Sequence, residues 1–77
     1  MIIYPNPAED YMNIIVSGPE DEYIELKIYN AIGEAIHYSE GKGALYEELS
    51  VSAYKPGMYM VTTLIGDILL KQNVLIK

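Results

Sequence analysis

Few side chains in this 77-residue chain have a type and spacing that could do chemistry. The chain has one histidine, His37, and no cysteine, so a zinc site would have to be built from carboxylates, which is unusual. Its four serines lie in no nucleophile motif, and Gly41-Lys42-Gly43 lacks the strand, loop and helix that surround a phosphate-binding loop. We therefore predict that the chain is not an enzyme and that His37 is a hydrogen-bonded surface residue.

Two acidic clusters and the tyrosines are the remaining candidates for binding. Glu9-Asp10 and Glu20-Asp21-Glu22 carry the oxygen ligands that calcium prefers, but their spacing matches no established calcium loop, so solvated loop charge is the simpler interpretation. Eight tyrosines without tryptophan or phenylalanine are compatible with a sugar-binding face. Tyrosine in a small β-sandwich more often fills core and corner positions. We expect no metal and no cofactor.

The distribution of charge and hydropathy excludes several classes of partner. Eleven acidic residues against five lysines give a net charge of −6, and the acids concentrate in residues 1–48, which carry −8 against +2 in residues 49–77. Nucleic acid is not an expected partner, because phosphate binding requires clustered basic side chains. No apolar run approaches the ~20 residues of a membrane helix. The opening residues lack the features of a signal peptide, so an extracellular role would make this chain a piece of a longer precursor.

Short strands separated by turn residues would position these side chains. Residues 22–30 alternate between apolar and polar side chains, the period of a half-buried strand, and residues 11–16 carry three apolar side chains on one face. An earlier strand that begins at Ile2 is closed by Pro5 and Pro7, which remove ladder donors and place it at a sheet edge or strand end. The apolar faces of the two longer strands are formed by Met12, Ile14, Val16, Ile24, Leu26 and Ile28.

Turn chemistry follows the second of these strands. Asn30-Ala31-Ile32-Gly33 predicts a type I turn with a bulge, because asparagine suits the first position and Gly33 supplies a left-handed residue. The returning strand is expected over residues 34–39, and Glu40-Gly41-Lys42-Gly43 is expected to be a flexible loop. Glu47 then interrupts an apolar face, so the next strand should begin near Glu48 or contain a bulge.

The strongest local signal is the last hairpin, in which two apolar, β-branched runs flank Gly66-Asp67. The two runs are Gly57–Ile65 and Ile68–Lys77. Tyr59 shares a face with Val61 and Thr63, so we expect its ring in the core. We expect the final strand to lie inside a sheet, where it would hold the chain end at a fixed place.

The spacing of these elements predicts the fold class. About seven short strands at intervals of roughly 8–12 residues, without a 3.6-residue apolar stripe, favour an all-β antiparallel sandwich over a small barrel. No linker or repeat divides the chain, so residues 1–77 are predicted to form a single domain.

Four stretches of the chain together carry a more specific pattern. They are Tyr4-Pro5-Asn6-Pro7-Ala8 before an alternating strand, Ile28-Tyr29-Asn30-Ala31-Ile32-Gly33-Glu34, Leu49-Ser50-Val51 leading through Tyr54 to Gly57-Met58-Tyr59, and Lys71-Gln72-Asn73-Val74-Leu75-Ile76-Lys77. In order and spacing they resemble the C-terminal sorting domain of type IX (Por) secretion cargo from Bacteroidetes bacteria. The family pattern usually has aspartate where Asn30 stands, and often lysine or arginine where Glu34 stands.

The resemblance implies a seven-stranded antiparallel immunoglobulin-like β-sandwich at the C-terminus of a larger secreted protein. Such a domain directs its N-terminal cargo through the type IX translocon, and a surface sortase then cleaves it off in many members. The implied route passes through the periplasm to the cell surface or the extracellular space, with no membrane insertion of the domain. The domain would be a substrate of that machinery.

On this interpretation the last hairpin forms the recognition face. The predicted recognition residues are Lys71, Val74, Leu75, Ile76 and Lys77. The predicted motif and structural residues are Pro5, Asn6, Pro7, Asn30, Gly33, Gly57 and Tyr59. Two alternatives remain open: a fibronectin-like or carbohydrate-binding accessory module of an extracellular enzyme, and a structural spacer without a partner.

Overall fold

The computed structural model describes residues 1–77, and all of its regular elements are β-strands. The strands are β1 (Ile2–Tyr4), β2 (Tyr11–Ser17), β3 (Tyr23–Tyr29), β4 (Ala35–Lys42), β5 (Ala44–Ser50), β6 (Gly57–Ile65) and β7 (Ile68–Ile76). Every pair of neighbouring strands is antiparallel. The structure has no helix of the length and apolarity needed to cross a membrane.

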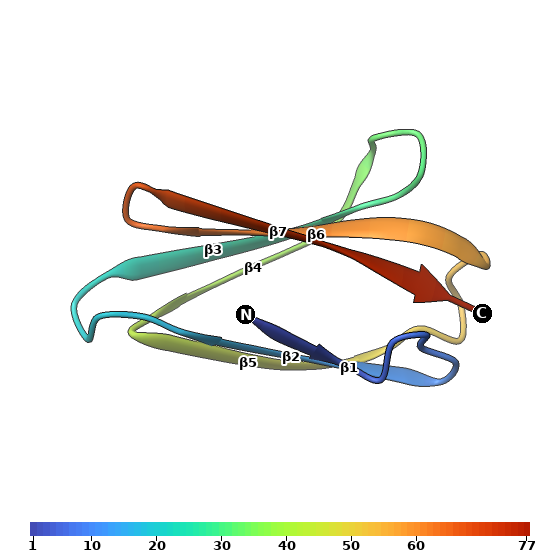
Figure 1. Cartoon of the computed structure of the whole chain (residues 1–77), viewed down its shortest axis with the longest axis horizontal. Coiled ribbons are helices and arrows are strands. Elements are labelled where there is room, and N and C mark those ends of the chain that lie inside the picture. Colours follow the sequence, from blue (N-terminus) through green and yellow to red (C-terminus); the bar gives the residue numbers. More distant parts are fainter.

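The strands form two antiparallel sheets that face each other (Figure 1). The small sheet has the order β1-β2-β5, and the large sheet has the order β4-β3-β6-β7. The sheets are joined where the chain passes from β4 to β5, through a single bridge between Lys42 and Ala44. The predicted all-β arrangement of seven antiparallel strands in two sheets is confirmed. The last strand, β7, lies at an edge of the large sheet, so the expectation that it lies inside a sheet is wrong.

The core lies between the sheets and is built from alternate residues of each strand. β2 and β3 each bury three apolar side chains, as their alternation predicts. The buried apolar residues are Ile3, Ala8, Met12, Ile14, Val16, Ile24, Leu26, Ile28, Val51, Tyr59, Val61, Ile65, Val74 and Ile76. Each large apolar side chain buried in this way stabilises the fold by about 1.5–3 kcal/mol before entropic costs, so the core explains the stability of a chain without disulfides.

The passage from β4 to β5 differs from the sequence prediction. β4 extends to Lys42, and β5 runs from Ala44 without a bulge, so the expected flexible loop over residues 40–43 and the late strand start are both wrong. Glu47 does face inward, and its carboxylate lies 3.4 Å from Nε2 of His37 on β4. A carboxylate is tolerated there because it has a partner from the other sheet and both side chains keep some solvent contact, 24% for His37 and 19% for Glu47. His37 is therefore half-buried between the sheets rather than on the outer surface.

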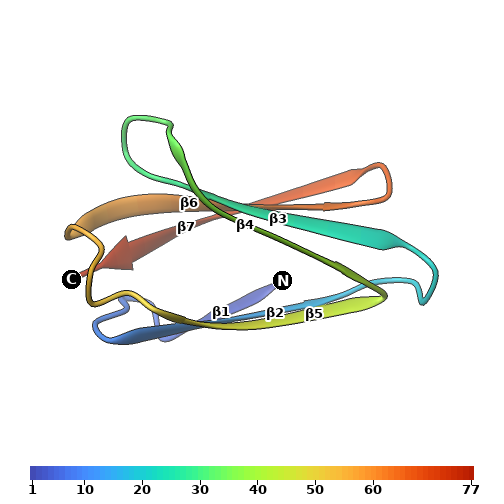
Figure 2. The same ribbon diagram turned by 180° about the vertical axis from the view of Figure 1, so that it is seen from behind.

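The two ends of the sandwich carry different loops (Figures 1 and 2). At one end lie the β2–β3 loop, the β4–β5 corner and the β6–β7 turn. The N–H of Gly43 in the corner donates to the carbonyl of Glu22, and the carbonyl of Gly43 accepts from the N–H of Gly18, each at 2.9 Å. Gly43 has φ of +76°, and a Cβ there would lie 2.9 Å from the carbonyl oxygen of Glu20, so the corner requires glycine.

Candidate functional site

The four motif stretches, far apart in the chain, meet at the other end of the sandwich (Figures 1 and 2). The β1–β2 loop, the β3–β4 turn, the β5–β6 connection and the C-terminus all lie there, and we call this region the motif end. The N–H of Val51 donates to the carbonyl of Asp10 at 2.8 Å and so links two of these segments. We take the motif end as the candidate site because residues of all four motif stretches, which are distant in the sequence, come together there.

The Pro5-Asn6-Pro7 segment pairs with the outer edge of β7. The side-chain amide of Asn6 accepts a hydrogen bond from the N–H of Leu75 at 3.1 Å and donates one to the carbonyl of Asn73 at 3.4 Å. The side chain therefore does what a peptide group of a neighbouring strand would do. Asparagine suits this role because its amide combines a donor with an acceptor, whereas prolines on either side have no N–H to contribute.

Backbone bonds extend this pairing beyond Asn6. The N–H of Ala8 donates to the carbonyl of Leu75, and the N–H of Lys77 donates to the carbonyl of Ala8, both at 2.8 Å. Ala8 is fully buried and forms a parallel bridge with Ile76. The segment Asn6–Ala8, which we call the clamp, thus occupies the edge of β7 over residues 73–77.

The β3–β4 turn is held by the side chain of Asn30. Its Oδ1 accepts hydrogen bonds from the N–H groups of Ile32 at 3.2 Å and Glu34 at 2.9 Å, and its Nδ2 donates to Oε1 of Glu34 at 2.9 Å. Gly33 has φ of +88°, and the register of β3 and β4 shifts at the end of β3, so the predicted left-handed glycine and bulge are confirmed. Asparagine in place of aspartate lets Glu34 approach, because an amide attracts a carboxylate that a second carboxylate would repel.

The β5–β6 connection is fixed by two tyrosines. The ring of Tyr59 is 7% exposed, and its hydroxyl donates to the carbonyl of Lys55 at 2.7 Å, so its predicted place in the core is confirmed. The ring of Tyr54 stacks on it with centroids 5.7 Å apart. Burial, with smaller contributions from Tyr59 and Glu47, raises the pKa of Tyr54. Gly57 begins β6 with φ of +150°.

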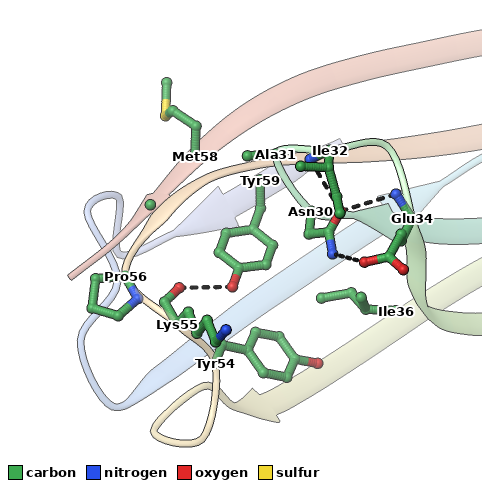
Figure 3. Close-up of a pocket in the computed structure, with 11 residues that line it drawn as sticks. Asn30, Ala31, Ile32, Glu34, Ile36, Tyr54, Lys55, Pro56, Met58 and Tyr59 are labelled. Carbon is green, nitrogen blue, oxygen red and sulfur yellow. Dashed lines mark hydrogen bonds between the residues drawn. The ribbon is translucent and has the colours of Figure 1, made fainter.

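A cleft of about 560 Å³ opens between the turn and this connection (Figure 3). Ile36, Tyr54 and Tyr59 line it alongside the polar side chains of Asn30 and Glu34, whose hydrogen bond lies at its wall (Figure 3). The cleft is open and most of its lining is apolar.

The structure divides the predicted recognition residues into two groups. Val74 and Ile76 are 0% and 1% exposed and belong to the core, so no partner can touch them while the domain is folded. Lys71 and Leu75 point to the outer face of the large sheet, and Lys77 follows β7 at the motif end. Leu75, with 37% exposure, lies opposite Met58 of β6.

The histidine and carboxylate side chains that could bind a metal or transfer a proton lie apart from one another, except for the His37–Glu47 pair. No three His, Cys, Asp or Glu side chains gather in a way that could hold a metal ion. Oγ of Ser39 is buried without a hydrogen-bond partner, so it does not form a relay with the His37–Glu47 pair.

Sequence reasoning missed the partners of Asn6 and of Glu47. The Asn6 contacts join residues 67 and 69 positions apart, and no local pattern encodes such a pairing. For Glu47 a signal existed, since His37 stands at an alternating position of the neighbouring strand and could have supplied a partner.

The comparison with known proteins agrees with the motifs. A model of the family described as secretion system C-terminal sorting domain matches residues 2–77, essentially the whole chain. A search of curated proteins finds no sequence that matches it.

Proposed function

Because the chain belongs to the secretion system C-terminal sorting domain family, we propose that it directs a larger cargo protein across the outer membrane and is recognised there through β7 and the motif end at which that strand finishes. The family is one of type IX secretion signals rather than of enzymes, and it is handled by that secretion system for export towards the cell surface or extracellular space. The observation that carries the proposal is the clamp, which holds the C-terminal residues at a fixed position on a folded domain.

Recognition after folding requires a surface whose geometry is defined. We assign direct contact to Lys71, Leu75 and Lys77, which are accessible on or beside β7. Val74 and Ile76 act from the core, where their burial fixes the strand that presents the other three.

The immunoglobulin-like form of the sandwich is part of the same proposal. The order of the seven strands supports it, with one difference: the fourth strand of a constant-type immunoglobulin domain lies on the sheet of the first, second and fifth strands, whereas β4 lies on the sheet of β3, β6 and β7. So does Tyr59, because a tyrosine near the start of the sixth strand that bonds back to the preceding connection matches the tyrosine corner of that fold. A single core shared by both sheets supports the assignment of residues 1–77 to one domain.

The partners follow from this role. The cargo lies N-terminal to the domain in the precursor, crosses the periplasm with it, and meets the translocon of the outer membrane. A surface sortase then removes the domain. Its net charge of −6 keeps the domain dispersed in transit.

Fusion of residues 1–77 to a periplasmic reporter in type IX-competent cells tests the proposal. We expect the reporter at the cell surface, and retention of a folded fusion in the periplasm would sink the idea. Leu75→Ala should reduce delivery, whereas Leu64→Ala is a matched control, because Leu64 on β6 has the same side chain and the same 37% exposure but lies near the β6–β7 turn, away from the motif end. Equal delivery by the two variants would argue against recognition at β7.

A second candidate is a sugar-binding accessory module. Tyr4, Tyr11 and Tyr46 are all about half exposed on the outer face of the small sheet, and the hydroxyl of Tyr46 donates to Oδ1 of Asn13 at 2.9 Å. Exposed tyrosine rings offer flat apolar faces, and their hydroxyls and the neighbouring amide offer hydrogen bonds, which together could hold a sugar ring. Two results together would favour this function: retardation of the domain in polysaccharide gels that Tyr46→Ala abolishes, and a reporter fusion that is not delivered to the cell surface.

A further inference from the structure

The clamp leaves the first half of β7 without a neighbour on its outer edge. The bonds made by residues 73, 75 and 77 to the clamp establish that odd-numbered residues of β7 direct their backbone groups outward. Strand geometry alternates, so Leu69 and Lys71 also direct an N–H and a carbonyl outward. β6 is the only strand beside β7, and these groups have no backbone partner.

This stretch is a long and accessible strand edge of the domain. The edge strand β1 has only three residues. The edges of β4 and β5 converge at the Lys42–Ala44 bridge, and the His37–Glu47 pair connects the two strands further along. β7 has nine residues, with Ile68 63% and Leu69 53% exposed. A long, apolar, unpaired edge is a site at which another chain can add a strand.

We propose that an extended segment of the secretion machinery adds as a strand to β7 along residues 69–73, next to the clamp. This inference rests on the proposed function and names how the partner binds. The segment carries an acidic side chain beside Lys71 and an apolar side chain beside Leu69. Lys71 makes no ion pair within the domain, and it is a positive charge on a chain of net −6, so an acidic partner side chain supplies what the domain itself does not.

A second copy of this chain fits the edge less well. Two-fold antiparallel pairing centred on residues 69–73 would place Lys71 opposite Lys71 of the other copy. Like charges directly opposite each other destabilise strand pairing, and lysine on an edge strand is a common guard against self-association. The charge therefore selects a different, acidic chain.

The test replaces the outward N–H without disturbing the ladder. Lys71→Pro removes a donor that no strand of the domain uses, and proline is tolerated at such edge positions. Lys71→Ala keeps the N–H and is the matched control for the lost charge. Both variants are compared in the reporter fusion, with circular dichroism to verify folding and a photo-crosslinking residue at position 69 to report contact.

We expect Lys71→Pro to fold and to lower surface delivery about two- to twelvefold below that of Lys71→Ala, the effect of losing the one net hydrogen bond that this N–H donates, while Lys71→Ala loses only the contribution of the charge. Full delivery by folded Lys71→Pro would overturn the inference, and so would a crosslink only to a second copy. If Lys71→Pro does not fold, the crosslink from position 69 decides. A crosslink to a different protein that Lys71→Glu abolishes supports the inference, and the absence of such a crosslink refutes the inference. Failure of the unmodified fusion would instead reject the proposed function.

Discussion

Replacing Asn6 with alanine should loosen the C-terminal half of β7 without disturbing the core. The change removes two hydrogen bonds to the strand, one from the N–H of Leu75 at 3.1 Å and one to the carbonyl of Asn73 at 3.4 Å. A net hydrogen bond contributes about 0.5–1.5 kcal/mol. Both bonds are exposed and one is long, so water replaces them in part and the expected loss is about 1–2 kcal/mol. That is a measurable share of the roughly 4–12 kcal/mol expected for a chain of this length.

Urea unfolding of Asn6→Ala measures the loss, and amide hydrogen exchange locates it. The Leu75 amide should lose its protection, while the amides paired between β3 and β6 keep theirs. Asn73→Ala is the matched control, because it alters the other exposed asparagine of the pair but keeps the backbone carbonyl, and it should change stability by less than about 0.5 kcal/mol. An unchanged urea midpoint together with a protected Leu75 amide would show that the clamp does not hold the strand.

Three further changes probe the rest of the motif end. Tyr59→Phe removes the 2.7 Å bond to Lys55 and should cost about 1–2 kcal/mol in urea unfolding, because the carbonyl loses its partner in a half-buried corner. Asn30→Asp should destabilise the turn by about 1 kcal/mol through repulsion of Glu34, and Glu34→Lys should restore most of it; simple additivity of the two changes would refute that coupling. Burial raises the pKa of Tyr54 above the ordinary value of 10.0, so the stabilising contribution of its neutral hydroxyl is complete below pH 10 and is lost as the pH rises through the folded-state pKa. The free energy of unfolding, measured at increasing alkaline pH, should therefore fall less steeply in Tyr54→Phe than in the unmodified chain.

The alternating strands were the part of the fold that the sequence predicted best. Ile24, Leu26 and Ile28 are fully buried because a half-buried strand must place alternate side chains on the core face. Gly33 was predictable for a similar reason, since its turn requires a positive φ. Such features depend on a few neighbouring residues.

The features that escaped prediction depend on residues brought together only by the complete fold. Glu47 interrupts an apolar pattern in the sequence, and its inward position is explained only by its contact with His37 of the other sheet. Asn6 is a turn residue by local chemistry and becomes a strand mimic only when β7 lies next to it. The recognition residues divide in the same way: alternation alone places Val74 and Ile76 in the core, but the free edge beside Lys71 appears only once the clamp is seen to stop at residue 73.

The clamp also has a consequence for how the chain folds. It joins Asn6 to residues 67 and 69 positions away, so it closes almost the entire chain into one loop. Closing a long loop costs entropy that few hydrogen bonds repay, so the hairpin of β6 and β7 and its pairing with β3 should form first. We expect Asn6 to have a φ-value near zero in folding kinetics, with its loss seen mainly in faster unfolding. The edge of β7 would then be bare in early folding and become covered only as the domain reaches its native state.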